Sequence, residues 1–339
     1  MLNKQNFQKL FSLSQTLGIK PVFLFLSFLF CFTSGSAQEN LVPNGSFEEY
    51  NWCPSFASGY NINASKFWNS PTLASPDYLN ACSTDFDFTL NQYYFSVPQN
   101  GYGNMYAKDG VAYAFIAYTQ NSDSSQAYSE YIQTPLKKTL NEGSLYTMVF
   151  YLNNPLLTCI NSIGALFTEQ ELNIPMDSLI QQKPQFQSDT SVFFCDTNAW
   201  IEVSFDFIAK GDEKFLTIGV FTSMGSMKLK NYEGNILDTS IYAYFYIDNI
   251  SLIETVIEIP NIFTPNNDGV NDIFDLSLYS KNIEKLIIFN RWGNAIIDKD
   301  KDFYWDGNSN QKQCDDGVYF YMLEFKNKSK KTGLIHLMR

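Results

Sequence analysis

The chain has 339 residues, a length that favours two or three domains over one. Its formal net charge is −12 and no basic stripe runs through it, so the composition argues against a nucleic-acid partner. Aromatic residues make up 17% of the sequence, including 30 Phe and 21 Tyr, and such residues favour strands.

The first 37 residues have the pattern of a secretory signal peptide. Their only charges are Lys4, Lys9 and Lys20, and a nearly all-apolar run, Pro21–Phe32, is followed by the small residues Ser34–Ala37. This order predicts cleavage after position 37 and does not favour a buried or membrane-spanning helix. No later segment predicts a transmembrane helix. Cleavage removes three Lys and no acid, so the net charge becomes −12 − 3 = −15.

Five of the six cysteines remain after cleavage, because one lies in the signal peptide. Export implies an oxidising route, so disulfides are expected, and no spacing suggests a zinc site. Order and separation favour the pairs Cys53–Cys82 and Cys159–Cys195, with Cys314 left unpaired. Sequence alone leaves the other connectivities open.

The mature chain reads almost entirely as strands. Apolar residues alternate with polar ones from Ile201 to Phe207, which is typical of a strand with one buried face. Four further strands are expected, at 111–119, 145–152, 215–221 and 242–253. With turn signals between them, this pattern predicts a β-sandwich. One short helix is expected around Pro175–Gln182, followed by a polar loop at 181–190.

A boundary is expected near residues 254–258, and the remainder has strands and turns of its own. Strands are expected at 285–290 and 318–325, with turns at Trp292–Asn294 and Trp305–Gly307. A segment of about 80 residues of this kind suits a small Ig-like sandwich. The predicted fold class is therefore all-β, with a larger sandwich at 38–254 followed by a smaller one at 258–339.

The C-terminal segment resembles a known sorting domain. Ile259–Phe274, Ile288–Gly293, Trp305–Gly307 and Asp316–Tyr321 follow the order and spacing of the type B, gliding-motility-associated C-terminal sorting domain of the Bacteroidetes type IX secretion system. The residues that carry the signature are Pro260, Asn261, Phe263, Thr264, Pro265, Asn266, Asp268, Gly269, Asn271, Asp272, Asn290, Arg291, Trp292, Gly293, Trp305, Asp306, Gly307, Asp316, Gly317 and Tyr319. Two small departures are Asn267, where the family often has Gly, and Asp315, where it often has Pro.

This resemblance implies passage across the inner membrane by the signal peptide and across the outer membrane by the type IX machinery. The protein would then be released or held at the cell surface. The residues also make physical sense alone, because Pro260 and Pro265 fix φ and Gly269 permits a tight turn. Trp292 and Trp305 are expected to anchor a small core.

The N-terminal part resembles another family. Asn40–Glu48, which reads Asn-Leu-Val-Pro-Asn-Gly-Ser-Phe-Glu, is similar to the first strand of galactose-binding-like jelly rolls, including many carbohydrate-binding modules. Tyr246–Ile250 is similar to their closing strand. The resemblance implies a jelly roll at 38–254 whose first and last strands lie together and share a structural calcium. Glu48 and Asp248 would be its carboxylate ligands, with Asp109 or a nearby carbonyl.

Calcium needs six to eight oxygen ligands, so these carboxylates alone are not a site, and solvated or hydrogen-bonded carboxylates are the alternative. Asp298, Asp300 and Asp302 also have the spacing of a calcium loop. Phe303 stands where such a loop needs Gly, so a solvated turn is favoured there.

Sugar binding needs exposed aromatic faces beside polar groups. The loop at 101–106 is the best candidate, with Tyr102 and Tyr106 as ligand-binding residues and Trp68 as a further one. Tyr93 and Tyr94 are held in reserve, since any one aromatic residue is more often part of a core.

Catalysis is not expected. The only histidine, His336, lies in the C-terminal segment, so the larger domain has no Ser-His-Asp or Cys-His arrangement. A glycosidase needs only two carboxylates, but no motif selects a pair among Glu130, Glu142, Glu202 and Asp206. We therefore expect a non-catalytic module that binds extracellular polysaccharide or cell-surface glycan, or mediates adhesion. The alternatives are a carbohydrate-active hydrolase or lyase and a structural surface or motility protein.

Overall fold

The computed structural model describes residues 38–339 except 60, 90, 121–126, 157, 178, 190, 223–228, 232–240, 256–258 and 327. The predicted signal peptide lies outside the described residues. Within them the regular secondary structure is β-strand, apart from two short 3-10 helices, η1 (Ile62–Ala64) and η3 (Ser277–Tyr279). The predicted all-β fold class is therefore confirmed.

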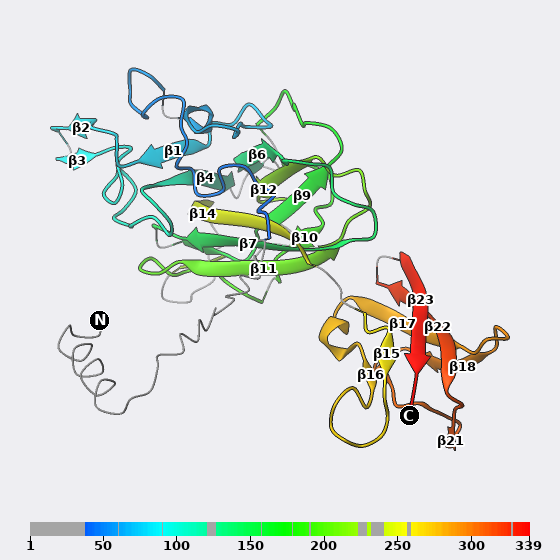
Figure 1. The fold of residues 1–339 in the computed structure, drawn as a ribbon. Helices are drawn as coiled ribbons and strands as arrows, with labels where there is room; N and C mark the ends of the chain where they lie inside the picture. Colours follow the sequence, from blue (N-terminus) through cyan, green and yellow to red (C-terminus); the bar gives the residue numbers. More distant parts are fainter. Residues whose placement is uncertain are drawn as a thin grey trace, which may run out of the picture. The chain divides into compact units, whose positions relative to one another are not determined.

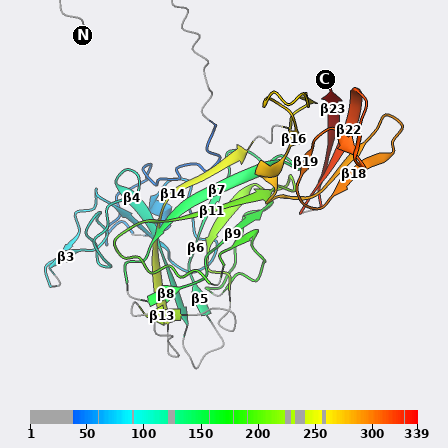
Figure 2. The ribbon, with the colours of Figure 1, turned by 90° about the horizontal axis from the view of Figure 1, so that it is seen from below.

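The larger of the two main sheets of the N-terminal part has six antiparallel strands. Its order is β1-β4-β14-β7-β11, with β5 also paired to β4 (Figure 1). The strands are β1 (Asp77–Asn80), β4 (Ala112–Gln120), β5 (Ala127–Ser129), β7 (Leu145–Asn153), β11 (Ile201–Ile208) and β14 (Ile241–Thr255). Figure 2 shows β14, β7 and β11 side by side.

The second main sheet has the order β10-β9-β12-β6 and is also antiparallel. Its strands are β6 (Tyr131–Pro135), β9 (Gly164–Thr168), β10 (Phe186–Gln187) and β12 (Phe215–Gly219). Two small ribbons accompany the sandwich, formed by β2 (Phe86–Asp87) with β3 (Gln92–Tyr93) and by β8 (Thr158–Ile160) with β13 (Leu229–Asn231).

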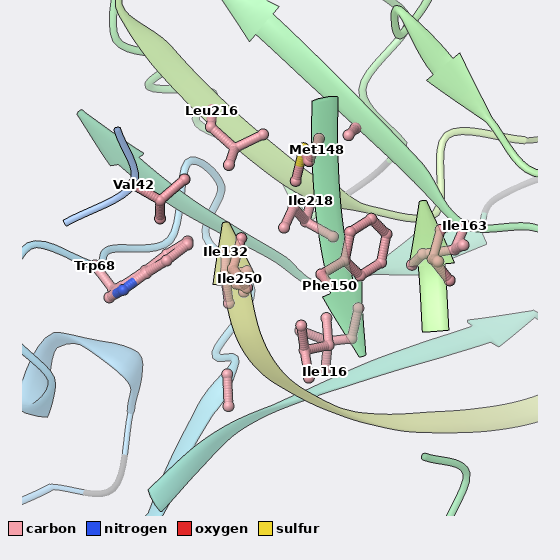
Figure 3. Close-up of a cluster of buried hydrophobic side chains, with 14 of the residues drawn as sticks. Val42, Trp68, Ile116, Ile132, Met148, Phe150, Ile163, Leu216, Ile218 and Ile250 are labelled. Carbon is pink, nitrogen blue, oxygen red and sulfur yellow. The ribbon is translucent and has the colours of Figure 1, made fainter. Parts of the chain in front are cut away.

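The main core contains apolar side chains from both sheets (Figure 3). Ile116 of β4 and Phe150 of β7 come from the six-stranded sheet, and Ile132 of β6 and Ile218 of β12 from the other. Because side chains alternate across a strand, β4 and β14 must present their remaining residues to the outside of the sandwich. That outer face holds the candidate site.

The segment at 41–45 runs beside the closing strand β14, as the jelly-roll resemblance implies. The Leu41 amide donates to the Leu252 carbonyl, and the Ile250 amide donates to the Gly45 carbonyl, both at 2.8 Å. Gly45 is needed at this close approach, since a Cβ there would lie 2.0 Å from the Ile250 carbonyl oxygen.

Both predicted disulfides are confirmed, and Cys314 is unpaired. Cys53–Cys82 closes a segment with a sequence separation of 29 residues, and Cys159–Cys195 one of 36 residues.

The short helix expected around Pro175–Gln182 is wrong, because the described residues of this stretch are irregular. Two long-range hydrogen bonds hold them in place instead. The Leu73 amide donates to the Met176 carbonyl at 3.1 Å, and the Ile180 amide donates to the Tyr131 hydroxyl at 3.1 Å. The loop expected at 181–190 includes the short strand β10.

The C-terminal part forms its own five-stranded sheet in the order β15-β23-β22-β17-β18. The strands are β15 (Ile262–Phe263), β17 (Ile283–Phe289), β18 (Ala295–Lys299), β22 (Gly317–Phe325) and β23 (Lys330–Leu337). β15 runs parallel to β23, and the other pairs are antiparallel. Two short ribbons pair β16 (Phe274–Asp275) with β19 (Tyr304–Trp305) and β20 (Asn308–Ser309) with β21 (Lys312–Gln313).

Trp305 anchors the core of this part, as expected, and packs against Phe263 and Tyr319. The same expectation for Trp292 is wrong, because its side chain is 76% exposed. Trp292 lies in the tight turn between β17 and β18, where side chains point to solvent. Among the described residues, no helix has the length and apolar character needed to cross a membrane.

Candidate functional site

Aromatic side chains form a layer on the outer face of the six-stranded sheet. Phe115 of β4 is paired in register with Tyr246 of β14, so both point to the same face. Tyr113 shares this face by alternation, and Tyr244 contacts Phe115 with ring centroids 5.4 Å apart. These rings belong to a buried cluster separate from the main core.

A loop that includes residues 97–107 packs on this layer. Its Tyr102 ring stacks on Phe115 with centroids 4.0 Å apart and planes 21° apart. Buried Asn100 fixes the loop, since it donates to the Tyr113 hydroxyl at 3.0 Å and accepts from the Tyr246 hydroxyl at 2.7 Å. Asn100 Oδ1 also accepts from the Tyr102 amide at 2.9 Å. The loop is therefore rigidly tied to the sheet.

Aromatic and charged side chains, some exposed and some half-buried, gather where this loop ends. We call them the Tyr106 patch: Tyr106, Lys108, Tyr151, Trp200 and Glu202. The Tyr106 side chain is 76% exposed, while its carbonyl accepts from the Trp200 indole N–H at 3.0 Å. The Lys108 ammonium lies 4.2 Å from the centre of the Tyr151 ring. The Tyr151 hydroxyl donates to Glu202 Oε2 at 2.8 Å. The Lys108 ammonium, the Glu202 carboxylate and the exposed Tyr106 ring therefore share one surface.

The structure separates the predicted ligand-binding residues. Tyr102 and Tyr106 lie on the anchored loop, half-buried and exposed respectively. Trp68 is 3% exposed and packs in the main core with its indole N–H bound to the Asn44 carbonyl at 3.0 Å (Figure 3). Trp68 thus presents no face to a ligand, and that expectation is corrected. The reserve residues Tyr93 and Tyr94 pack against Phe86 and Phe56 respectively.

Sequence reasoning missed Trp200, Tyr151, Phe115 and Tyr244. The signal available was the aromatic residue at every second position of β14, where Tyr242, Tyr244 and Tyr246 alternate with core residues. A strand with apolar or aromatic residues on both faces cannot bury both in a single core, so one face must point outward.

Two buried carboxyl groups lie beside the aromatic layer. Asp77 is paired in register with Phe115, and Asp77 Oδ2 accepts from the Tyr102 hydroxyl at 3.3 Å. Glu130 accepts from the Tyr128 hydroxyl at 2.6 Å and from the Ala117 amide at 2.7 Å. Burial raises the pKa of both groups, and the charge of Glu130 raises the pKa of Asp77 further. Asp77 and Glu130 are each 5% exposed.

The predicted calcium ligands converge on the loop that precedes β4. Asp248, fully buried, accepts from the Lys108 amide at 2.7 Å and from the Asp109 amide at 3.1 Å. Glu48 Oε1 accepts from the Val111 and Ala112 amides at 3.0 and 3.1 Å. Burial raises the pKa of Asp248 to about 8, and the Glu48 charge adds to this rise. Burial also raises the pKa of Glu48, as does the charge of Asp109 to a smaller degree.

Backbone amides therefore satisfy much of what these carboxylates need. In the part of the chain that the structure describes, no three His, Cys, Asp or Glu side chains form a group that could hold a metal ion. Glu48 and Asp248 fit calcium only if backbone carbonyls or water complete its shell, because calcium takes six to eight oxygens. In the other acidic run, Asp298 lies in strand β18 and forms an ion pair with Lys285 at 2.9 Å, so only Asp300 and Asp302 lie in the turn expected there.

The first signature segment of the C-terminal part contains a turn that is held by hydrogen bonds among its own residues. Asp272 Oδ1 accepts from the Asn266 and Asn267 amides at 3.0 and 2.7 Å, and its Oδ2 accepts from the Gly269 amide at 2.8 Å. Asp268 Oδ1 accepts from the Val270 amide at 2.8 Å. These carboxylates order the turn from within.

The third and fourth signature segments, which contain Gly307 and Asp316, meet at Arg339. Arg339 forms an ion pair with Asp316 at 2.9 Å and donates to the carbonyls of Cys314 and Gly307. Gly307 has φ of +82°, and a Cβ there would lie 3.0 Å from the Arg339 guanidinium. Asn290 Oδ1 accepts from the Trp292 and Asn294 amides at 3.1 and 3.0 Å, which closes the turn that exposes Trp292.

Several solved structures are similar to parts of this chain. The CBM22-1 xylan-binding domain of Xyn10C from Paenibacillus barcinonensis matches at 10% identity and a TM-score of 0.30, covering 66% of this chain and 98% of its own. The K3 cleaved adhesin domain of Lys-gingipain from Porphyromonas gingivalis matches at 10% identity and a TM-score of 0.30, covering 64% and 98%. TmCBM61, solved with β-1,4-galactotriose, matches at 10% identity and a TM-score of 0.27, covering 64% of this chain and 99% of its own. At these scores the likeness assigns no ligand to the chain.

No curated protein matches the sequence. The model of the CHU_C type IX secretion signal domain matches residues 257–337, which include the strands from β15 to β23 and all four signature segments. This match confirms the C-terminal resemblance. The C-terminal part of the chain is therefore a type IX secretion signal domain, and the protein is exported to the cell surface or the extracellular space.

Proposed function

We propose that the jelly-roll part of this exported protein binds extracellular polysaccharide or cell-surface glycan through the Tyr106 patch, without cleaving it. The observation that carries the proposal is the exposure of the Tyr106 ring, at 76%, on a loop held by buried hydrogen bonds. An exposed aromatic side chain on an ordered loop loses little conformational entropy when it meets a ligand.

The chemistry of the patch suits a sugar ring. An aromatic face packs against the C–H face of a sugar, while polar groups at its edge bind the hydroxyls. Lys108 offers N–H donors and Glu202 offers carboxylate acceptors beside the rings of Tyr151 and Trp200. Tyr102 supports the loop from below by stacking on Phe115, so we assign it a positioning role.

The alternative of a carbohydrate-active hydrolase gains little support from the described carboxylates. Asp77 and Glu130 have the raised pKa values that a general acid needs, but both are 5% exposed and already bound to tyrosine hydroxyls. Glu202 and Asp206 are exposed, and their carboxylates accept hydrogen bonds from the Tyr151 and Thr147 hydroxyls respectively. A structural role without a ligand is the remaining alternative, and the test below separates it.

The test is affinity electrophoresis of the exported chain through gels that contain a panel of soluble polysaccharides. We expect at least one polysaccharide to retard the protein and Tyr106→Ala to abolish the retardation, because losing the stacked ring weakens binding by about tenfold or more, or about 1.4 kcal/mol. Phe88→Ala is the matched control, because Phe88 is 90% exposed on the separate β2–β3 ribbon. Release of new reducing ends would instead favour the hydrolase, and lack of retardation in every gel would favour the structural role.

We also propose that Glu48 and Asp248 hold a structural calcium ion together with backbone carbonyls of the loop at 108–110. The two carboxylates face the same loop, and the pKa of Asp248 is raised mainly by burial and to a smaller degree by the repulsive Glu48 charge. A divalent cation would offset this repulsion. Calcium-dependent melting of the exported chain tests this proposal, with magnesium as the control ion.

A further inference from the structure

Asp77 and Glu130 differ in the hydrogen bonds they receive. Each oxygen of Glu130 accepts a short bond, from the Tyr128 hydroxyl at 2.6 Å and from the Ala117 amide at 2.7 Å. Within the described part of the chain, Asp77 accepts only from the Tyr102 hydroxyl at 3.3 Å, and its buried Oδ1 has no partner there. An ionised carboxylate in a dry site needs donors on both oxygens. Glu130, whose pKa burial raises to about 7, is therefore better placed than Asp77 to carry a charge, and Asp77 is the group better suited to the neutral form.

The surroundings of the pair favour retention of one proton. The ionisable groups that face it from neighbouring elements are Tyr102 of the loop, Tyr128 of β5 and Tyr244 of β14. Each of these is neutral at ordinary pH, and no cation acts on the pair among the described residues. Two buried like charges without a cation are strongly unfavourable, so one group keeps its proton.

We propose that Asp77 keeps a proton beside Glu130, and that this proton fastens the loop at 99–106 onto the sheet, where the Tyr102 hydroxyl binds Asp77. The pair then regulates the Tyr106 patch, because the same loop carries Tyr106. In this respect the inference rests on the proposed glycan site.

The direction of the pH effect follows from the two states of the loop. With the loop closed, burial and the Glu130 charge raise the pKa of Asp77 to about 8 from an ordinary value of 3.8. With the loop open, water reaches Asp77 and its pKa returns toward the ordinary value. Opening thus releases a proton at any pH between these values. The equilibrium constant for loop closure is therefore highest below pH 4. It falls by up to about tenfold per pH unit above that and stays constant above about pH 8.

Hydrogen exchange measured by mass spectrometry tests the proposal on the whole exported chain without ligand. We expect the protection factor of residues 99–106, corrected for the intrinsic exchange rate, to fall by up to about tenfold per unit from pH 5 to pH 8. In Asp77→Asn it should stay level, because Asn keeps an acceptor for the Tyr102 hydroxyl but does not ionise. Asp212→Asn, which alters an exposed carboxyl elsewhere, should follow the wild type.

Three outcomes would overturn the proposal. A level wild-type profile would show that no proton is coupled to the loop. A slope that persists in Asp77→Asn would point to another group, such as Glu130, whose pKa burial raises to about 7, or Asp248, which binds the Lys108 amide beside the loop. Recovery of protection at pH 8 on adding calcium or sodium would show that a cation, and not a proton, occupies the pair.

If Asp77→Asn does not fold, a carbon-13 titration of the Asp77 carboxyl in the wild type takes its place. A titration midpoint of Asp77 far above the ordinary range for aspartate supports the retained proton, and an ordinary midpoint refutes it. Because neither experiment uses a glycan, failure of the loop mechanism is distinguishable from failure of the glycan site.

Discussion

Replacing Gly110 by Ala tests how the first and last segments of the jelly roll meet. Gly110 has φ of +70°, and a Cβ built there would lie 2.1 Å from the Glu48 carboxyl carbon and within 2.4 Å of both its oxygens. The Glu48 carboxylate must therefore move and lose its bonds to the Val111 and Ala112 amides.

The expected loss has two parts. Placing Ala at positive φ costs about 1 kcal/mol. Losing two hydrogen bonds to a half-buried carboxylate costs about 1 kcal/mol each after partial rehydration. The total is about 3 kcal/mol, which corresponds to a fall of roughly 6–12 °C in the melting temperature of a unit of this size. Gly143→Ala is the matched control, because Gly143 has φ of +75° and nothing within 4 Å of a built Cβ.

The assay is differential scanning calorimetry of the exported chain in chelator, followed through the jelly-roll transition. Gly143→Ala should lose only about 1 kcal/mol, or roughly 2–4 °C. In a Glu48→Ala background, Gly110→Ala should cost no more than Gly143→Ala, because the carboxylate that it displaces is gone. Equal losses for Gly110→Ala and Gly143→Ala in the wild-type background would refute the contact with Glu48.

Three other predictions concern metal, export and disulfides. Calcium should raise the melting temperature, by about 2.7 kcal/mol of stability at a hundredfold excess over Kd, and Asp248→Ala should remove this response; identical melts with chelator and with calcium would discard the site. Deleting residues 258–339 should leave the protein in the periplasm, and normal surface or medium levels of the truncated form in cell fractions would contradict the sorting role. Replacing both Cys53 and Cys82 by Ser should cost about 3.6 kcal/mol from the closed loop alone, measured by urea unfolding; a loss below about 1 kcal/mol would contradict this estimate.

Local patterns predicted much of the fold. The alternation from Ile201 to Phe207 appears as strand β11, and the run at 242–253 lies within β14. The two disulfides followed from order and separation. These features depend on short-range periodicity or on few pairing choices, which a sequence displays directly.

Long-range packing decided what the sequence did not predict. Trp68 lies in the core, where its indole N–H donates to the Asn44 carbonyl. No local sequence pattern predicts this contact. The aromatic layer depends on the register of β4 with β14, and that register is a property of the assembled sheet. Asp77 went unnoticed because its neighbour Glu130 is distant in sequence.

In the sorting domain, too, local patterns were predictable from the sequence and long-range contacts were not. Its signatures were recognisable as turn-forming runs, and the structure shows Asp272 ordering the first of them through three backbone amides. The ion pair between Arg339 and Asp316 joins segments that only the fold brings together. The exposure of Trp292 could not be predicted, since residue size alone suggested a core position.

Direct titration of a glycan into the exported chain tests the central claim most simply. A glycan array first identifies a ligand, and isothermal titration calorimetry then compares the wild type with Tyr106→Ala and Phe88→Ala. The account predicts measurable affinity for the wild type and Phe88→Ala, a loss of about tenfold or more for Tyr106→Ala, and no cleavage of the ligand. Unchanged affinity in Tyr106→Ala, or turnover of the glycan, would contradict it.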